Sequence, residues 1–244
     1  MPTFEKGRVM ETPKGEKIYT LTPEELLGRP LNDVENKYAP RKLYVAGDAK
    51  KIPLSGPRTA IIGSRKASPQ GLKAAGDIAK TLVRKGVVVV SGLAEGIDTA
   101  AHNTTIEEGG QTIAVLGTPL DRVYPQKNLQ LQEAIKRHHL AISQFPIGHP
   151  TLPKNFVLRN RTMALISDAS IIVEAGDTSG SLHQGWEALR LGRPLFIWKS
   201  VMNDPSLSWP KKMGEYGALE LTEPEEVVDL LPSSEIILEI NVPV

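Results

Sequence analysis

Two segments, IIGSR at residues 61–65 and VVVVSGLAEGID at residues 87–98, give the first indication of the architecture. Each is a short apolar run that ends abruptly in small residues. A strand whose two faces are both covered needs no polar alternation, so such runs are typical of buried strands in a parallel sheet. The small residues then stand where a strand ends and a helix begins. A doubly wound sheet binds its ligands at such points.

The same alternation of strand and helix continues through the middle of the chain. Strands are predicted at residues 59–63, 87–91, 112–117, 140–145, 170–175 and 194–198. Between them, helices are predicted at residues 69–85, 97–108, 128–138 and 155–167, and a further helix ends at residue 191. Strict alternation favours a parallel sheet with right-handed crossovers. The predicted fold is therefore α/β, a doubly wound, mostly parallel sheet of the extended Rossmann-like kind.

The periodicity divides the chain into three parts. Residues 1–58 are expected to form a short N-terminal lead-in or small subdomain, with a helix start at Thr22-Pro23-Glu24-Glu25 and a strand at residues 43–47. Residues 59–199 are the predicted Rossmann-like core. Residues 200–244 are a small, acidic C-terminal α/β appendage, with a short strand at 218–221 and a capped acidic helix at 222–231. Residues 235–240 are either an edge strand or a partner-dependent tail.

Composition excludes several kinds of protein and site. The chain of 244 residues has no cysteine, so disulfides and thiolate metal sites are excluded. It has no long apolar run and no signal-peptide pattern at its start, which favours a cytoplasmic protein with no membrane span. Neither the G-x-G-x-x-G fingerprint nor the Walker A lysine is present, and the histidines do not form an H-x-x-x-H pair. No cofactor and no metal site are therefore expected.

The charge is distributed unevenly along the chain. From Met213 onward there are eight acidic residues and no lysine or arginine, so residues 1–212 carry 29 bases against 20 acids, a net charge of +9. A basic body suits a polyanionic ligand. Solvated surface charge with a chance asymmetry explains the same numbers equally well.

Phosphate-binding residue types converge on one edge of the predicted sheet. Because the carboxyl ends of parallel strands lie along one edge, hydroxyls, free N–H groups and arginines that follow different strands meet there. Such a set suits a phosphate-rich ligand. Any single glycine turn has a packing explanation, and of the pair Arg159 and Arg161 one could lie on a solvated helix face while the other pairs with Glu or Asp. The expected members are Gly63, Ser64, Arg65, Ser91, Gly92, Gly117, Arg159, Asn160, Arg161, Ser179, Gly180 and Ser181.

Asp98 and His102 lie four residues apart and share one helix face. They could be an acid–base pair. The favoured interpretation is that the acid, in the first turn of the helix, supports a buried histidine by a hydrogen bond, because no nucleophile or metal set accompanies them. No catalytic residue is therefore predicted.

Several ordered blocks of the sequence resemble the DNA-processing protein A (DprA/Smf) family. They are Gly63-Ser64-Arg65 and residues 87–102, 109–128, 141–148, 156–167 and 170–182. The resemblance covers roughly residues 40–230. It implies an extended Rossmann-like core, binding of single-stranded DNA without sequence preference, a homodimer, and delivery of DNA to a RecA-type recombinase during natural transformation. Proteins of this family are not established as enzymes.

Carried over by this resemblance, the DNA-contacting residues are Ser64, Arg65, Lys127, Arg159, Asn160, Arg161 and the turn 179–181. The chain departs from the family at Gln144, where Glu is usual, at residues 162–165 and at residues 198–204. It is also expected to lack the helical domain that often precedes the core and the winged-helix domain that often follows it. These departures make the recombinase and the dimer less secure expectations than the fold.

Two other classes of function remain open. The fold group is similar to cytokinin-activating phosphoribohydrolases, in which a glycine-rich turn supplies a catalytic Glu. Gln184 stands at that position here, and an amide cannot act as a general acid or base. The third class is a nucleotide-binding sensor that does not bind DNA. All three share the phosphate-binding edge and differ in the length of the ligand.

Overall fold

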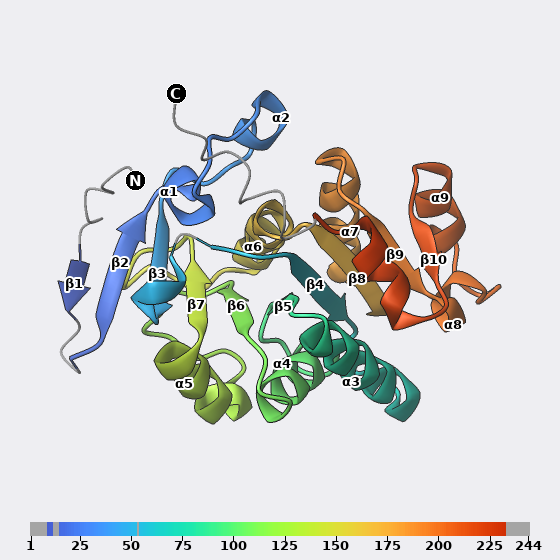
Figure 1. Cartoon of the computed structure of the whole chain (residues 1–244), viewed down its shortest axis with the longest axis horizontal. Helices are drawn as coiled ribbons and strands as arrows, with labels where there is room; N and C mark the ends of the chain where they lie inside the picture. Colours follow the sequence, from blue (N-terminus) through green and yellow to red (C-terminus); the bar gives the residue numbers. More distant parts are fainter. Residues whose placement is uncertain (1–8, 12–14, 53, 233–244) are drawn as a thin grey trace, which may run out of the picture.

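The computed structural model describes residues 9–11, 15–52 and 54–232, whose strands form one ten-stranded sheet with helices on both faces (Figure 1). The strands follow the order β1-β2-β3-β7-β6-β5-β4-β8-β9-β10. All pairs from β7 to β10 are parallel, and the pairs that involve β1, β2 and β3 are antiparallel. The prediction of a doubly wound, mostly parallel sheet is confirmed.

The parallel part of the sheet is wound outward from β4 in two directions. The chain passes from β4 to β5, β6 and β7 on one side, and then returns to β8 on the other side of β4. The junction between β4 and β8 is therefore the topological switch point, where sheets of this kind open a crevice. The parallel strands are β4 (Arg58–Gly63), β5 (Val88–Ser91), β6 (Thr112–Leu116), β7 (Leu140–Ser143), β8 (Ala169–Glu174), β9 (Leu195–Trp198) and β10 (Leu219–Leu221).

The N-terminal part of the chain adds an antiparallel edge to this sheet. Strands β1 (Val9–Glu11) and β2 (Lys17–Leu21) did not show in the sequence pattern, whereas β3 (Leu43–Gly47) lies where a strand was predicted. Val45 of β3 pairs with Ile142 of β7, so the predicted lead-in shares the sheet of the core. Helix α1 (Pro23–Leu27) begins with the predicted Thr22 cap, and the short helices α2 (Asp33–Asn36) and η1 (Ala49–Lys51) follow.

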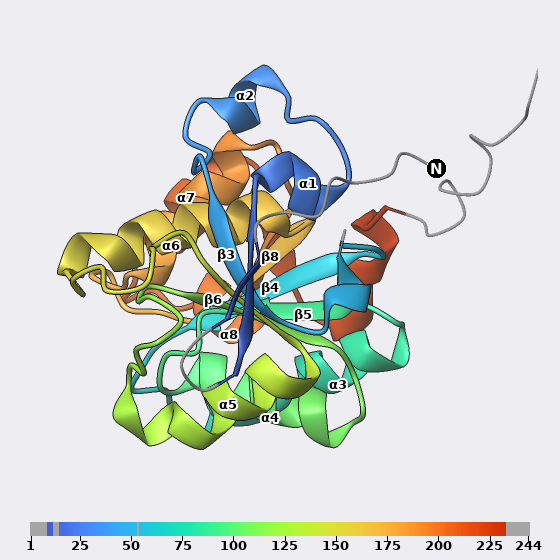
Figure 2. The ribbon, with the colours of Figure 1, turned by 90° about the vertical axis from the view of Figure 1, so that its left-hand side faces the viewer.

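Helices cover both faces of the sheet (Figure 2). On one face, α3 (Pro69–Arg84), α4 (Ile97–Glu107) and α5 (Leu129–His138, preceded by η2, Gln126–Asn128) bury Ile61, Val89 and Leu116. On the other face, α6 (Pro153–Ile166), α7 (Ser181–Arg190) and α1 pack against Ile62 and Ile142. Two separate apolar layers therefore hold the strand ends rigidly in place.

The C-terminal part continues the second half of the sheet. Helices α8 (Lys199–Met202) and α9 (Trp209–Glu215) follow β9 and were not predicted, and Trp209 of α9 is buried in the core. The acidic helix predicted at 222–231 is a 3₁₀ helix, η3 (Pro224–Leu230). The alternatives for residues 235–240 lie outside the described residues. Within the described residues, no helix is long and apolar enough to span a membrane.

Candidate functional site

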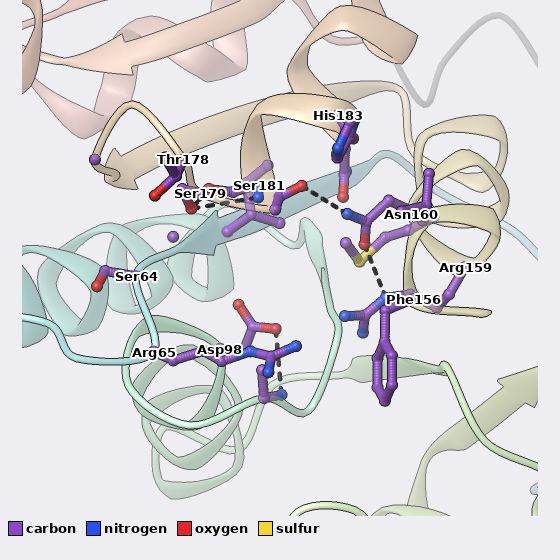
Figure 3. A pocket seen from close by; sticks show the side chains of 18 of the residues that line it. Ser64, Arg65, Asp98, Phe156, Arg159, Asn160, Thr178, Ser179, Ser181 and His183 are labelled. Atoms are coloured by element: carbon purple, nitrogen blue, oxygen red, sulfur yellow. Dashed lines mark hydrogen bonds between the residues drawn. The ribbon is translucent and has the colours of Figure 1, made fainter. Parts of the chain in front are cut away.

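A cavity of about 460 Å³ opens at the switch point between β4 and β8 (Figure 3). It is built from the end of β4, the loop that follows β8 and the inner side of α6. Strand β4 contributes Gly63, where a Cβ would overlap Ile97 and the carbonyl of Glu174, so β4 lies unusually close to its neighbours. The predicted convergence at the carboxyl edge therefore exists, but it is centred on this one junction.

The rim of the cavity is formed by Ser64, Arg65 and Lys66, directly after β4. The N–H of Ser64 donates to the carbonyl of Glu174 (2.6 Å), and its hydroxyl accepts from the N–H of Lys66 (3.1 Å). The exposed Arg65 guanidinium lies 5.5 Å from the ring centroid of Phe156, a cation–π distance. Within the described residues, neither Arg65 nor Lys66 forms an ion pair, so two positive charges face the opening.

The loop before α7 closes the opposite side of the cavity. The hydroxyls of Ser179 and Ser181 are 2.6 Å apart, and the carbonyl of Gly180 accepts from the Asn160 amide at 2.9 Å. Asn160 therefore ties α6 to this loop. The exposed His183, in the first turn of α7, also lines the cavity. His183 was not among the predicted site residues, because a residue close to a glycine turn belongs to no periodic pattern of apolar and polar residues.

The floor of the cavity contains Arg159, whose side chain donates hydrogen bonds to backbone carbonyls of the protein itself. Only 5% of the residue is exposed. Its Nη1 donates to the carbonyls of Gly92 and of Val115 (2.9 Å), and its Nε donates to Asn160 Oδ1 (2.9 Å). A Cβ at Gly92 would overlap the guanidinium, so glycine is required there. Arg159 therefore ties together the ends of β5 and β6. Nη2 is its one nitrogen without a hydrogen bond to the described residues.

Asp98 lies beside this floor at the start of α4. Its Oδ2 accepts from the N–H groups of Gly92 (3.1 Å) and Ala94 (3.3 Å). Burial raises the pKa of the Asp98 carboxyl, while Arg159 and these N–H groups act in the opposite direction. Burial lowers the pKa of Arg159, and Asp98 counters that effect. The floor thus holds a buried carboxyl and a buried guanidinium, and each partly offsets the effect of burial on the other.

His102 does not take its hydrogen bond from Asp98, so the favoured interpretation of this pair is wrong in its partner. The His102 ring is fully buried and its Nδ1 lies 2.7 Å from Thr112 Oγ1, while the described residues offer Nε2 no partner. Burial lowers the pKa of His102 to about 3. The acid and the histidine are therefore two separate structural groups, because Asp98 binds N–H groups of the loop after β5 whereas His102 contacts Thr112 of β6.

Some of the predicted site residues lie away from the main cavity. Ser91 is fully buried and donates to the carbonyl of Ile61 (2.6 Å). Gly117 lies under the Phe156 ring and, with Gly92 and Arg65, lines a small adjoining recess of about 40 Å³. Lys127 is exposed and pairs with Glu95 (2.6 Å). Arg161 points to the outer side of α6, where it contacts Tyr38.

The two glutamines at positions of interest are both held by the core. Gln184 is fully buried and its Nε2 donates to Ser170 Oγ at 3.3 Å. Gln144 Oε1 accepts from the Thr162 hydroxyl at 2.5 Å. Gln184 therefore packs as an interior amide, and no described carboxylate takes the place of a catalytic Glu at this turn. No cluster of three or more metal-ligating side chains occurs among the described residues.

The chain matches a known protein family over most of its length. The profile of the family described as DNA recombination-mediator protein A matches residues 23–232. This chain belongs to that family. Recombination-mediator protein A relatives include DNA processing protein DprA of Streptococcus pneumoniae, 40% identical over 190 residues, which are 78% of this chain and 66% of the relative. DprA of Bacillus subtilis is 33% identical over 79% of this chain and 65% of its own length. Protein Smf of Escherichia coli is 35% identical over 79% and 51%.

These recombination-mediator relatives are longer than the matched segment, which spans between half and two thirds of their length. Solved structures of the family agree with the fold. The X-ray structure of Streptococcus pneumoniae DprA has a TM-score of 0.75 at 33% identity and covers 88% of this chain and 74% of that one. The Helicobacter pylori protein, described for its single-stranded DNA binding mode, has a TM-score of 0.72 at 27% identity, with 87% and 94% covered.

Proposed function

We propose that this chain binds single-stranded DNA by its phosphates at the β4–β8 cavity. The observation that carries the proposal is the unpaired Arg65 on the cavity rim, beside the Phe156 ring and next to Lys66. Proteins that bind single strands without sequence preference combine a basic groove with aromatic side chains on which bases stack. Arg65 and Lys66 provide the charge, while Phe156 provides a ring at the same mouth.

The remaining wall of the cavity suits a bound phosphate group rather than a bound cation. Ser64, Ser179 and Ser181 bring hydroxyl groups to it, and Gly180 leaves its backbone open to approach. Among the lining residues of the described chain, Asp98 carries the only carboxylate, and that carboxylate is bonded to backbone N–H groups below the rim. Arg159 contributes positive potential from the floor through its Nη2, with its other nitrogens engaged by the protein.

The wider role follows from the family and is proposed on the same basis. The chain acts as a DNA-processing protein in DNA uptake, transformation or recombination, where it protects single-stranded DNA and passes it to a RecA-type recombinase. It does so in the cytoplasm, as a homodimer and without enzymatic turnover. The names of the relatives support DNA processing, and the buried Gln184 argues against phosphoribohydrolase chemistry.

The test is a titration of labelled oligo-dT of thirty nucleotides at several salt concentrations. Matching duplex, AMP and ATP serve as competitors. We expect binding that weakens steeply with salt, because each neutralised phosphate contributes about 0.7 to the slope for a single strand. Mononucleotides should not compete. Tight binding of AMP or ATP without DNA binding would instead make the protein a nucleotide sensor.

Arg65→Ala tests the residue that carries the proposal. We expect affinity for oligo-dT to fall about tenfold and the salt slope to shrink by about 0.7, with at most a small loss of thermal stability, because the exposed side chain loses only its cation–π contact with Phe156. Arg84→Ala is the matched control, since Arg84 is exposed, has no ion pair within the described residues, and lies on α3 across the sheet. Equal binding by the two variants and the unaltered protein would refute the proposal.

A further inference from the structure

Arg161, singled out by the sequence, belongs to a cluster on the outer side of α6 and α7. The guanidinium carbons of Arg161 and Arg190 each lie 4.8 Å from the ring centroid of Tyr38, and Lys37 Nζ lies 5.4 Å from it. We call these four residues the Tyr38 cluster. They come from three parts of the chain: the segment after α2, the middle of α6 and the end of α7. None of them lines the cavity.

Most of the positive charge of the Tyr38 cluster is available to a ligand. Lys37 and Arg161 form no ion pair with any described residue. Arg190 pairs with Glu187 and also donates to the carbonyl of Val34. Tyr38 is 43% exposed. The cluster therefore presents an accessible aromatic side chain among three cations, of which one is neutralised.

The cluster is joined to the cavity by α6 and α7. On α6, Asn160 binds the loop beside the cavity, and the next residue, Arg161, reaches Tyr38. Helix α7 begins at the cavity with Ser181 and His183 and ends at Arg190. Figure 2 shows α2 above α6 and α7 on the same side of the sheet. The seven helical steps from His183 to Arg190 span about 10 Å, which is about three nucleotides at the strand spacing of stacked DNA.

We propose that the Tyr38 cluster is a second contact for single-stranded DNA, occupied by the strand that leaves the cavity along α6 and α7. The inference rests on the proposed function of the cavity. Guanidinium and ammonium groups around an exposed tyrosine suit a phosphate chain whose bases find an aromatic edge. His183 marks the exit from the cavity toward this surface. A strand of about three nucleotides is too short to leave the cavity and also cover the distance to Arg190, whereas a longer strand reaches the cluster.

The experiment compares oligo-dT of three and of twenty nucleotides on the double variant Lys37→Gln/Arg161→Gln. For the twenty-mer we expect about tenfold weaker binding and a salt slope smaller by about 1.4, because two phosphate contacts are lost. For the three-mer we expect binding within twofold of the unaltered protein. Lys37→Arg/Arg161→Lys keeps both charges and should restore the salt slope of the twenty-mer. Arg84→Gln is the control for a cation on the opposite face.

The outcomes separate this inference from the proposed function. If the double variant binds both oligonucleotides normally while Arg65→Ala binds neither, the cavity function stands and the second contact is refuted. If the double variant changes only the melting temperature, the cluster is a clamp that fastens the segment after α2 to α6 and α7, and the inference is equally refuted. If Arg65→Ala has no effect on the three-mer, the proposed function itself fails.

Discussion

The floor and the rim of the cavity each contain an arginine, which is buried on the floor and exposed on the rim. On the floor, Arg159 is buried and its guanidinium holds the carbonyls of Gly92 and Val115. On the rim, the exposed Arg65 guanidinium lies over the face of Phe156 and forms no ion pair with the described residues. A buried charge must be balanced by its surroundings, whereas an exposed one is free for a ligand. The floor therefore shapes the site, while the charge on the rim is available to a ligand.

The largest effect should come from removing the floor arginine. Arg159→Gln leaves Asp98 without its cation and two carbonyls without their donor, so we expect a loss of stability of about 3 kcal/mol. Denaturant unfolding measures it. In the fraction that remains folded, the salt slope of oligo-dT binding should stay unchanged, in contrast to Arg65→Ala. A slope reduced by about 0.7 would mean that Arg159 also neutralises a phosphate, and the separation of roles would fail.

A smaller effect is expected from the glycine that accommodates Arg159. Gly92→Ala places a Cβ inside the guanidinium, so the arginine must move, and we expect a cost of about 2 kcal/mol in the free energy of unfolding. Gly180→Ala is the matched control, because a Cβ there meets nothing within 4 Å and its φ of −62° suits alanine. Similar melting temperatures for the two variants would show that Arg159 can move aside with little loss of stability.

The next effect is a dependence of stability on pH that originates from the buried His102 of α4. His102 has its pKa lowered to about 3, so the unfolded chain takes up a proton below about 6.5 while the folded chain does not. Stability is therefore complete above pH 6.5 and falls as pH falls toward 3, by up to about 1.4 kcal/mol per pH unit for this proton.

His102→Asn should flatten this dependence. His139, whose pKa burial lowers to about 4, keeps part of the slope in the same range. Denaturant unfolding from pH 7 to pH 4 measures both. An unchanged slope in His102→Asn would show that another group governs the acid range.

The smallest effect concerns an ion pair next to the rim. Lys127 pairs with Glu95, both side chains being exposed, so the pair contributes little to stability, about 0.5 kcal/mol or less. Glu95→Gln removes one negative charge and releases Lys127, and we expect binding of oligo-dT about twofold tighter with unchanged melting temperature. Weaker binding in this variant would mean that the pair itself positions the DNA.

Much of the central fold could be predicted because its signals are local. The apolar runs of β4 and β5 and the Ser68-Pro69 start of α3 stand in the sequence itself. Strand β2 could not be predicted in the same way. It alternates little, and its place beside β3 depends on a pairing with a segment more than twenty residues away. Helix α9 is likewise fixed by the burial of Trp209 rather than by its own pattern.

The sequence predicted which edge of the sheet carries the candidate site, but not the direction in which each side chain points. Residues 159–161 were expected to act together, but successive helix residues point about 100° apart, so Arg159, Asn160 and Arg161 face the floor, the loop and Tyr38 in turn. Helix α6 is buried on most sides, which leaves no polar stripe from which its rotation could be predicted.

The sequence by itself determined the order of strands and helices, the glycine and serine turns at the strand ends and the absence of cysteine chemistry, because these depend on residue type and near neighbours. Only the tertiary structure decided which cations are free. Whether Arg65, Arg159 or Arg161 faces solvent, backbone or an aromatic ring depends on how α6 packs between two strand ends and α7, and packing joins residues that are far apart in the chain.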